Sequence, residues 1–446
     1  MARSGIACAK LLNDAGASVR INDMKSAEQI GSALDVLKTE GIEWRLGENV
    51  EDLLDGMDYL VISPGIPFDH PAVLKAKNMG VHVIGEIEAA YRLGQGKVIG
   101  ITGTNGKTTT TTLVGEIFRN AGKITHVVGN IGDAYSASAG KMRPEDAVVC
   151  ELSSFQLESI DTFRPEIAAV LNLTEDHLNR HKTMENYGNV KKRVFENQSE
   201  NDFAVLNYDD AFTVKMAEGI KSSVYWFSRT KAVDRGAAVE GELIVFTDKD
   251  GVKTNVCRVE DVYIPGPHNL ENALAATCIA MCAGVPSPVI RHTLRTFRGV
   301  EHRIETVRTV DGVKYINDSK GTNPDSTVKA VETMKEDTVI ILGGSEKDSD
   351  FTYLSGLIAK SKIHFAVLIG KTGERIGQSL EKAGFTQYEY TGYDFVRAVE
   401  TARAHAHEGG NVLLSPACAS FDMFKDYEER GRVFKDIVNA LKEKEA

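Results

Sequence analysis

The stretch VIGITGTNGKTT, from Val98 to Thr109, decides the fold, because it predicts a buried strand, a glycine-rich turn and the start of a helix. Such a turn holds phosphate: backbone N–H groups face the oxygens, the Lys107 ammonium adds positive charge, and the Thr108 hydroxyl can bind Mg²⁺. The full pattern G-x-x-x-x-G-K-[ST] is not met, since Ile101 stands where its first glycine belongs. We interpret the stretch as a shortened ATP loop rather than a plain glycine turn. Its candidate ATP-binding residues are Gly103, Thr104, Asn105, Gly106, Lys107, Thr108 and Thr109.

Outward from this loop, the same plan of strand, polar loop and helix recurs. Apolar runs lead into Asn130, Glu151 and His177, in that order along the chain. Right-handed crossovers make these strands parallel, so their carboxyl ends meet at one edge beside the ATP loop. Glu151 and His177 are therefore candidate ligands of a metal ion or its water. A carboxylate at a strand end can also be only a helix cap, but we favour the functional interpretation.

Two pairs of polar residues follow in the same region. Lys191 and Lys192 lie near the start of a predicted helix, and for adjacent lysines the residues alone favour a solvated face. Asn269 and Asn272 precede an apolar helix expected over 273–283, and their spacing places them on one helix face. Capping explains one of these asparagines well, but a pair is more than a cap needs.

The length of 446 residues suggests about three domains. Residues 1–93 predict a Rossmann-like unit that enters a helix from a turn at Ser4-Gly5; its first strand is missing, which indicates a truncated or misassigned start. Residues 94–298 predict a P-loop parallel sheet with an antiparallel addition at about 201–261. Residues 299–446 predict a second Rossmann-like sheet whose first strand starts at His302 to Glu305. The fold class is therefore α/β.

The composition is that of a globular protein, and its net charge of -11 argues against a general nucleic-acid binder. No apolar run is long enough to cross a membrane and no signal peptide is evident, so we expect a cytoplasmic protein. The six cysteines form no C-x-x-C pair, which excludes a zinc ribbon of the usual spacing. Cys278 and Cys282 share a helix face, and core packing explains them better than a metal does.

Six motifs, taken in order, resemble those of the Mur ligases, the ATP-dependent enzymes that add amino acids to the peptidoglycan precursor. They span nearly the whole chain: GTNGKTT (103–109), ELSSFQL (151–157), TEDHL (174–178), GPHNLENA (266–273), HR (302–303) and NDSK (317–320). The two ends, SPGI (63–66) and LSPACASFD (414–422), are most similar to the branch that adds D-glutamate. The resemblance implies that ATP converts the carboxylate of UDP-N-acetylmuramoyl-L-alanine into an acyl phosphate, which the amine of D-glutamate then attacks.

The resemblance also implies roles for the central residues. Lys107 and Thr108 would hold the ATP phosphates and one Mg²⁺, with Glu151 on that ion and His177 on a second. Lys191, four residues after a tyrosine, would be carbamylated and would help to hold the metals, which replaces the solvated-face interpretation. The remaining ATP contacts would be Asn269 and Asn272 at the adenine, Arg303 at the phosphates, Asp318 at the ribose, and Lys320 at the phosphate and reacting carboxyl region.

The two substrates would be held mainly by the ends of the chain. The UDP-linked substrate would meet Asn130 near its carboxylate and Ser4, Asp23, Ser63 and Gly65 at its UDP group. D-Glutamate would meet Thr322, Lys347, Ser420, Phe421 and Tyr427. Departures from relatives occur at Met24, Lys25, Ser345 and Tyr427. We expect a monomer that acts on these small molecules, binds no nucleic acid, is not inserted in a membrane, and closes its C-terminal domain over the site before chemistry.

Three alternatives stay open at this point. A sister Mur ligase or a folylpolyglutamate synthase would share the central motifs, and only the two ends speak against them. A P-loop kinase or ATPase would release ADP without an amino-acid acceptor. A truncated chain could also be an ATP-binding remnant without ligase activity, although the preserved central motifs argue against this.

Overall fold

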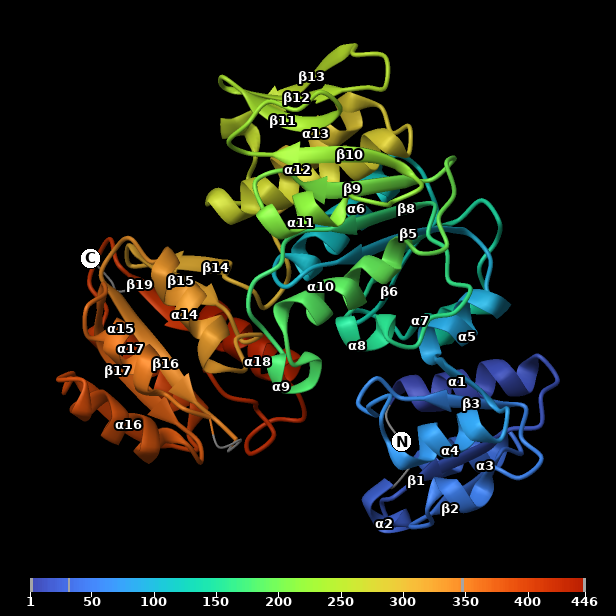
Figure 1. Ribbon diagram of the computed structural model, residues 1–446. Helices are drawn as coiled ribbons and strands as arrows, with labels where there is room; N and C mark the ends of the chain where they lie inside the picture. The colour runs from blue at the N-terminus through green and yellow to red at the C-terminus, as the bar shows by residue number, and fades with distance from the viewer. Residues whose placement is uncertain (1–2, 31–32, 346–348, 444–446) are drawn as a thin grey trace. The chain divides into compact units, whose positions relative to one another are not determined.

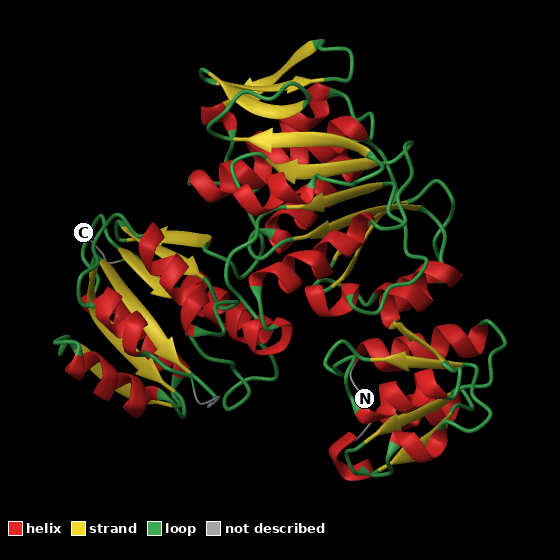
Figure 2. Ribbon diagram, in the orientation of Figure 1, coloured by secondary structure: helices red, strands yellow, loops and turns green. Residues whose placement is uncertain are grey.

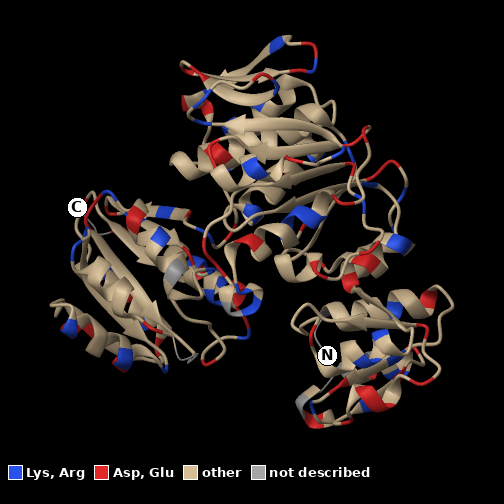
Figure 3. Cartoon of the chain, viewed as in Figure 1, with Lys and Arg blue, Asp and Glu red and all other residues tan. Residues whose placement is uncertain are grey.

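The computed structural model describes residues 3–30, 33–345 and 349–443, and its chain divides into two compact units, Met1–Phe297 and Arg298–Ala446 (Figure 1). Helices and strands alternate through both units, which confirms the α/β class (Figure 2). Basic and acidic residues are interspersed along the helices and loops of each unit (Figure 3).

A large sheet in the first unit carries the ATP loop. Its order is β13-β12-β11-β10-β9-β8-β5-β7-β6, so β5 (Lys97–Thr102), which leads into the loop, lies between β7 and β8. These three strands are almost wholly buried, as parallel strands are when helices cover both faces. The other bounds are β6 (Thr125–Gly129), β7 (Ala147–Glu151), β8 (Ile167–Val170), β9 (Phe203–Asn207), β10 (Ser223–Ser228), β11 (Gly236–Glu240), β12 (Leu243–Thr247) and β13 (Lys253–Arg258).

The antiparallel part of this sheet is smaller than the sequence suggests. Strands β8 to β11 pair in parallel, and only the pairs β11–β12 and β12–β13 among the described strands of this sheet are antiparallel. The expected antiparallel addition over 201–261 is therefore wrong for β9 and β10. Alternation of apolar residues shows which face of a strand is buried and carries no information about strand direction.

Helix α6 (Lys107–Asn120) packs against β6, β7 and α12 (Pro267–Cys282), and α12 also contacts β9 and β10. Ala273, the expected first residue of the apolar helix, lies inside α12, which begins at Pro267. The other helices of this region are α7 (Tyr135–Ala139), α8 (Ser154–Leu157), α9 (Leu178–His181), α10 (Met184–Lys192), α11 (Ala211–Met216) and α13 (Ser287–Thr296), with 3-10 turns at Arg193–Phe195 and Val259–Asp261.

The N-terminal part contains two separate parallel pairs, β1 (Arg20–Asp23) with β2 (Glu43–Leu46) and β3 (Tyr59–Ile62) with β4 (His82–Gly85). No described strand joins the two pairs. Helix α1 (Arg3–Asp14) bridges them, because Ala9 packs with Leu37 and Ile42 while Cys8 packs with Ile84. Parallel strand pairs with helices between them agree with the predicted Rossmann-like character of this part. Ser4 and Gly5 lie inside α1 rather than in a preceding turn.

The remaining elements of this part cover the strand pairs. They are α2 (Ala27–Ile30), α3 (Ala33–Thr39), a 3-10 turn at Val50–Leu53, α4 (Pro71–Asn78) and α5 (Glu86–Leu93). Helix α5 contacts both α1 and α7, and Ile87 belongs to the same buried cluster as Val98 of β5. The N-terminal part is thereby packed onto the central sheet.

The second unit is built on a sheet of order β14-β15-β19-β16-β17-β18, in which only the β14–β15 pair of the described strands is antiparallel. The expected start of its first strand is wrong: β14 begins at Glu305, because His302 and Ile304 have φ angles of 64° and 45°, outside the extended region. Bounds are β14 (Glu305–Val310), β15 (Val313–Asn317), β16 (Thr338–Gly343), β17 (Ile363–Ile369), β18 (Tyr388–Gly392), β19 (Asn411–Leu414), α14 (Pro324–Thr333), α15 (Thr352–Ile358), α16 (Gly373–Lys382), α17 (Phe395–His405) and α18 (Tyr427–Ala440).

None of the described helices combines the length and the apolar character needed to cross a membrane.

Candidate active site

The ATP loop turns sharply between β5 and α6. Gly103 and Gly106 have φ angles of 152° and 81°, which favour glycine. The Lys107 ammonium donates to the carbonyls of Gly103 and Thr104 at 2.8 and 2.7 Å, so its charge lies over the loop. Thr108 is buried at the start of α6. The loop, its lysine and a helix N-terminus therefore occur together, as a phosphate site requires.

Lys191 lies directly behind this loop. Its side chain is 1% exposed, its ammonium donates to the Gly103 carbonyl at 2.9 Å, and it lies 4.7 Å from the centre of the Tyr187 ring. Burial, and secondarily the charge of Lys107, lower the pKa of Lys191 well below its usual value. The solvated-face interpretation is therefore wrong for Lys191. Lys192 differs, because its ammonium donates to the Glu218 carbonyl at an exposed position.

Glu151 ends β7 with a side chain that is almost fully buried. Its Oε1 accepts a hydrogen bond of 2.8 Å from the Asn130 side-chain amide. Its Oε2 is buried and has no hydrogen-bond partner within the described part of the chain. A buried carboxylate oxygen in this state calls for a cation or a water, which fits the predicted role of Glu151.

His177 precedes α9 in a left-handed conformation with φ 53° and is exposed to solvent. Its ring centre lies 4.9 Å from that of Phe155, and its Nε2 lies 3.4 Å from the Asp176 carboxylate. His181, one turn later, is buried, stacks on Phe155 and shares a hydrogen bond of 2.9 Å with the Ser154 hydroxyl. His177 is thus the accessible imidazole of the two.

These residues fit a Mg²⁺ site that ATP completes. Within residues 3–30, 33–345 and 349–443, no group of three or more His, Cys, Asp or Glu side chains could hold a metal by itself. Mg²⁺ commonly keeps waters and phosphate oxygens and needs few protein ligands. The open Glu151 oxygen and the Thr108 hydroxyl are oxygen donors of the right kind, and a neutral Lys191 amine can react with CO₂ to supply a further carboxylate.

Asn269 and Asn272 are hydrogen-bonded neighbours, and Asn272 lies against the ATP loop. The Asn272 Oδ1 accepts from the Thr110 hydroxyl of α6 at 3.2 Å, and a Cβ added to Gly106 would lie only 2.2 Å from that oxygen. The Asn272 amide donates to Asn269 Oδ1 at 3.3 Å. Helix α12 therefore brings Asn272 to the turn of the loop, with Asn269 hydrogen-bonded beside it.

The predicted UDP contacts are spread over the N-terminal part. Ser63 and Gly65 lie in an exposed turn after β3, Asp23 ends β1, and Ser4 is half-buried in α1. The Asp23 carboxylate accepts from the Lys25 N–H at 2.9 Å. Ser63 and Gly65 are brought together by their shared turn.

In the second unit, Asp318 is buried at the end of β15. It accepts from the Ser415 hydroxyl at 2.6 Å and from the Ile304 N–H at 3.2 Å, and burial raises its pKa to about 6. Arg303 and Lys320 line a small cleft together with Asp318. Three of the predicted ATP contacts are therefore neighbours in this unit.

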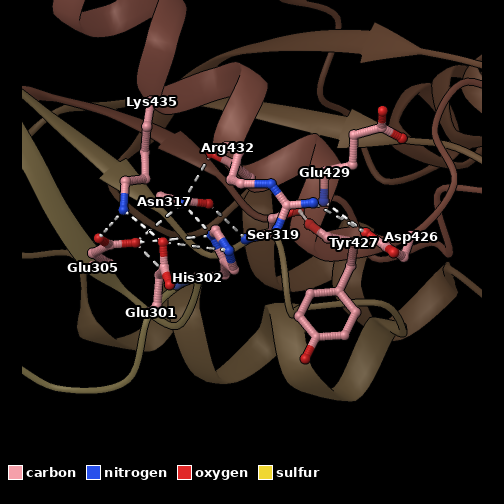
Figure 4. Close-up of polar contacts among 11 residues, drawn as sticks. Glu301, His302, Glu305, Asn317, Ser319, Asp426, Tyr427, Glu429, Arg432 and Lys435 are labelled. Atoms are coloured by element: carbon pink, nitrogen blue, oxygen red, sulfur yellow. Dashed lines mark hydrogen bonds and ion pairs between the residues drawn. The ribbon is translucent and has the colours of Figure 1, made fainter. Parts of the chain in front are cut away.

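Of the predicted D-glutamate residues, Thr322 lies in the loop after β15, Ser420 and Phe421 lie in the loop after β19, and Tyr427 is the first residue of α18. The Ser420 hydroxyl is buried and, among described residues, without a partner, whereas the adjacent Phe421 is 70% exposed. Thr322 is half-buried. The Tyr427 carbonyl accepts from the Ser319 hydroxyl at 2.8 Å, and its phenol group points away from the surrounding polar network (Figure 4). Lys347 lies outside the described residues.

That polar network holds the turn before β14. His302 and Asn317 share a hydrogen bond of 2.9 Å, and Lys435 pairs with Glu301 and Glu305, both at 2.9 Å (Figure 4). Because His302 precedes Arg303 and Asn317 precedes Asp318, the network fixes the backbone that carries two predicted ATP contacts.

Sequence reasoning missed Arg430. Its guanidinium is fully buried in α18 and donates to Ser319 and to the Cys418 carbonyl, which joins the loop after β15 to the loop after β19. Burial lowers its pKa to about 10. An arginine on an amphipathic helix ordinarily lies on the solvated face. The sequence around Arg430 therefore does not indicate that this side chain is buried and joins two loops.

Three family descriptions match successive parts of the chain. Residues 1–85 match "Mur ligase MurD-like, N-terminal domain", residues 101–280 match "Mur ligase middle domain", and residues 302–418 match "Mur ligase, glutamate ligase domain".

Two relatives carry the name UDP-N-acetylmuramoylalanine–D-glutamate ligase. The protein from Caldanaerobacter subterraneus subsp. tengcongensis is 46% identical over 440 residues, which cover 98% of this chain and 96% of the relative. The protein from Clostridioides difficile is 47% identical over 444 residues, covering 99% and 97%.

Solved structures show the same fold at lower identity. The UDP-N-acetylmuramate–alanine ligase MurC of Thermotoga maritima has a TM-score of 0.59 at 20% identity and covers 98% of both chains. The MurF ligase of Thermotoga maritima in complex with ADP has a TM-score of 0.55 at 17% identity, covering 87% of this chain and 96% of that one.

Proposed function

The chain belongs to the Mur ligase family, and from this premise we propose that it joins D-glutamate to UDP-N-acetylmuramoyl-L-alanine with consumption of ATP. The reaction is a step of peptidoglycan precursor synthesis. The observation that carries the proposal is the match along nearly the whole chain, at 46–47% identity, to D-glutamate-adding ligases.

The reaction proceeds in two steps. The L-alanyl carboxylate attacks the γ-phosphorus of ATP, which forms an acyl phosphate and releases ADP. The D-glutamate amine then attacks the acyl carbon, loses a proton, and phosphate leaves as the amide forms. Two anions meet in the first step, so its main requirement is positive charge around the transferred phosphoryl group.

The chain supplies that charge from separate elements. Lys107 holds the phosphates over the loop of Gly103 to Thr109, and Arg303 and Lys320 act on the phosphates and the reacting carboxyl group. Asn269 and Asn272 hold the adenine, and Asp318 accepts from the ribose. The contacts that support these roles are the Lys107 and Asn272 bonds to the ATP loop and helix α6, and the cleft shared by Arg303, Asp318 and Lys320.

Two Mg²⁺ ions would be held by Thr108, Glu151, His177 and a carbamate formed on Lys191. When bound, they would neutralise phosphate charge and orient the attack. The buried, partner-free Glu151 oxygen and the lowered pKa of Lys191 support this assignment. Carbamate formation needs the neutral amine, and burial favours that form.

The substrates are assigned to the two ends of the chain. Asn130, beside Glu151, contacts the UDP-linked substrate near its carboxylate, and Ser4, Asp23, Ser63 and Gly65 contact its UDP group. Thr322, Lys347, Ser420, Phe421 and Tyr427 contact D-glutamate. The orphaned Ser420 hydroxyl supports a polar ligand at this end. The proposal also includes three domains, at residues 1–93, 94–298 and 299–446. It further includes a cytoplasmic location and a monomeric state.

The test is ATP-dependent phosphate release with UDP-N-acetylmuramoyl-L-alanine and a panel of D- and L-amino acids. We expect stimulation by D-glutamate alone. Stimulation by another amino acid would identify a different ligase, and phosphate release without any acceptor would favour an ATPase or kinase.

A further inference from the structure

Arg180 of α9 reaches the N-terminal part of the same unit. Its guanidinium donates to the carbonyls of Gly65 at 3.4 Å and Ile66 at 3.2 Å, in the turn that follows β3. The same guanidinium pairs with the Glu158 carboxylate, and its side chain is only 16% exposed. Arg180 is therefore a cation that Glu158 holds in place, and it contacts a turn more than a hundred residues away in the sequence.

On its other side, Arg180 belongs to the aromatic group beside the proposed metal site. Its guanidinium carbon lies 4.6 Å from the centre of the Phe155 ring, and the ring centres of His177 and His181 lie 4.9 and 5.6 Å from that of Phe155. His181 in turn lies 5.1 Å from Tyr187, which is within hydrogen-bond distance of Thr104 in the ATP loop. Packed rings thus connect the turn at Gly65 to the ATP loop.

We propose that Arg180 is a positioning residue that sets the Gly65–Ile66 turn for the UDP-linked substrate and ties it to the ring of His177. Two bonds to backbone carbonyls fix the turn without depending on its side chains, and the same guanidinium lies over the Phe155 ring. Lysine cannot reproduce this combination, because its ammonium is a point charge without a planar face. The inference rests on the proposed contact between this turn and the UDP group.

The experiment compares Arg180→Met, Arg180→Lys and the matched control Arg193→Met in the full-length enzyme. Arg193 also donates to backbone carbonyls and pairs with a glutamate, but its partners, Leu157, Ile160 and Glu196, lie outside the Gly65 turn. It therefore reports the general cost of losing an arginine that supports this region.

For Arg180→Met we expect the KM for UDP-N-acetylmuramoyl-L-alanine to rise about tenfold or more, since two charge-assisted bonds are lost. The KM values for ATP and D-glutamate should stay within about twofold. The Kd of the UDP-linked substrate, measured by calorimetry without ATP, should rise in parallel. Arg180→Lys should recover part of the affinity, and Arg193→Met should lower thermal stability without the selective change in KM.

Equal changes in all three KM values, or an unchanged Kd for the UDP-linked substrate, would overturn the assignment. If Arg180→Met folds poorly because Glu158 is left unpaired, the double variant Arg180→Met with Glu158→Gln removes that charge and serves for the same comparison. Ser63→Ala separates the two proposals: if it raises the substrate KM while Arg180→Met does not, the turn binds the substrate and the role of Arg180 is wrong. If neither variant changes the KM, the assignment of the turn itself is wrong.

Discussion

Lys191 is buried where a lysine ammonium is costly, between the Gly103 carbonyl and the Tyr187 ring. If its role is to carry a carbamate, Lys191→Ala should lower ligase activity at least about a hundredfold, and added bicarbonate should not restore it. Wild-type activity should fall in CO₂-depleted buffer and return with bicarbonate. Lys192→Ala is the control, because the Lys192 ammonium donates to the Glu218 carbonyl at an exposed position. Full activity of Lys191→Ala would contradict the carbamate hypothesis.

Asp318 makes a second prediction at the residue scale, through pH. Burial raises the carboxyl pKa from 3.8 to about 6, so the folded state binds a proton more tightly than the unfolded state and is penalised once the group ionises. The penalty is absent below about pH 4, grows between pH 4 and 6, and is complete above pH 6, where it is about 3 kcal/mol.

Asp318→Asn should therefore be more stable than the wild type above pH 6, and the difference should vanish as the pH falls toward 4. Thermal or urea unfolding across this pH range measures it. Asp394→Asn, which replaces the exposed residue that caps α17, is the control for exchanging a carboxylate for an amide at a solvated position, because asparagine caps a helix as well as aspartate does. A stability difference for Asp318→Asn that does not change with pH would contradict the argument.

At the scale of elements, the ATP loop depends on how closely α12 approaches the start of α6. A methyl group on Gly106 would meet Asn272 Oδ1 at 2.2 Å and would also sit at φ 81°. Gly122, just after the same helix, has φ 76° and open space around its Cβ position. Gly122→Ala should cost about 1 kcal/mol from backbone strain alone, whereas Gly106→Ala should cost about 1–3 kcal/mol more from overpacking. Urea unfolding compares the two.

Asn272→Ala in the Gly106→Ala background should return part of this extra cost, because it removes the clash and leaves only the strain. Equal free energies of unfolding for Gly106→Ala and Gly122→Ala would show that α12 does not pack against the loop in the way described.

For the whole molecule, the division into Met1–Phe297 and Arg298–Ala446 predicts two thermal transitions in calorimetry. The ATP loop lies in the first unit, so Mg²⁺ and ADP should raise its transition by mass action. D-Glutamate, whose proposed contacts lie in the second unit, should raise the other. A single transition that moves equally with either ligand would contradict independent units. Sedimentation of the same sample tests the expected monomer.

Much of this fold follows from local pattern. The apolar runs at β5, β7 and β8 and the glycine turn after β5 predict the parallel sheet and its loop, since short apolar runs that end in polar turns are typical of strands buried on both faces. The directions of β9 and β10 and the start of β14 were predicted wrongly. Direction and positive φ angles are settled by partners that are distant in the sequence, which a local pattern does not contain.

The sequence by itself determined the order of motifs, the phosphate loop and the family, because each is recognised from short stretches of neighbouring residues. Only the tertiary structure decided that Lys191 is buried rather than solvated, that Glu151 keeps an open oxygen, and that Arg180 reaches the turn at Gly65. Burial and polar satisfaction depend on which segments meet in space, and the same side chain in the same helix can face water or the core. For this reason, the residue types indicate which chemistry is possible, and the packing determines which of those residues can perform it.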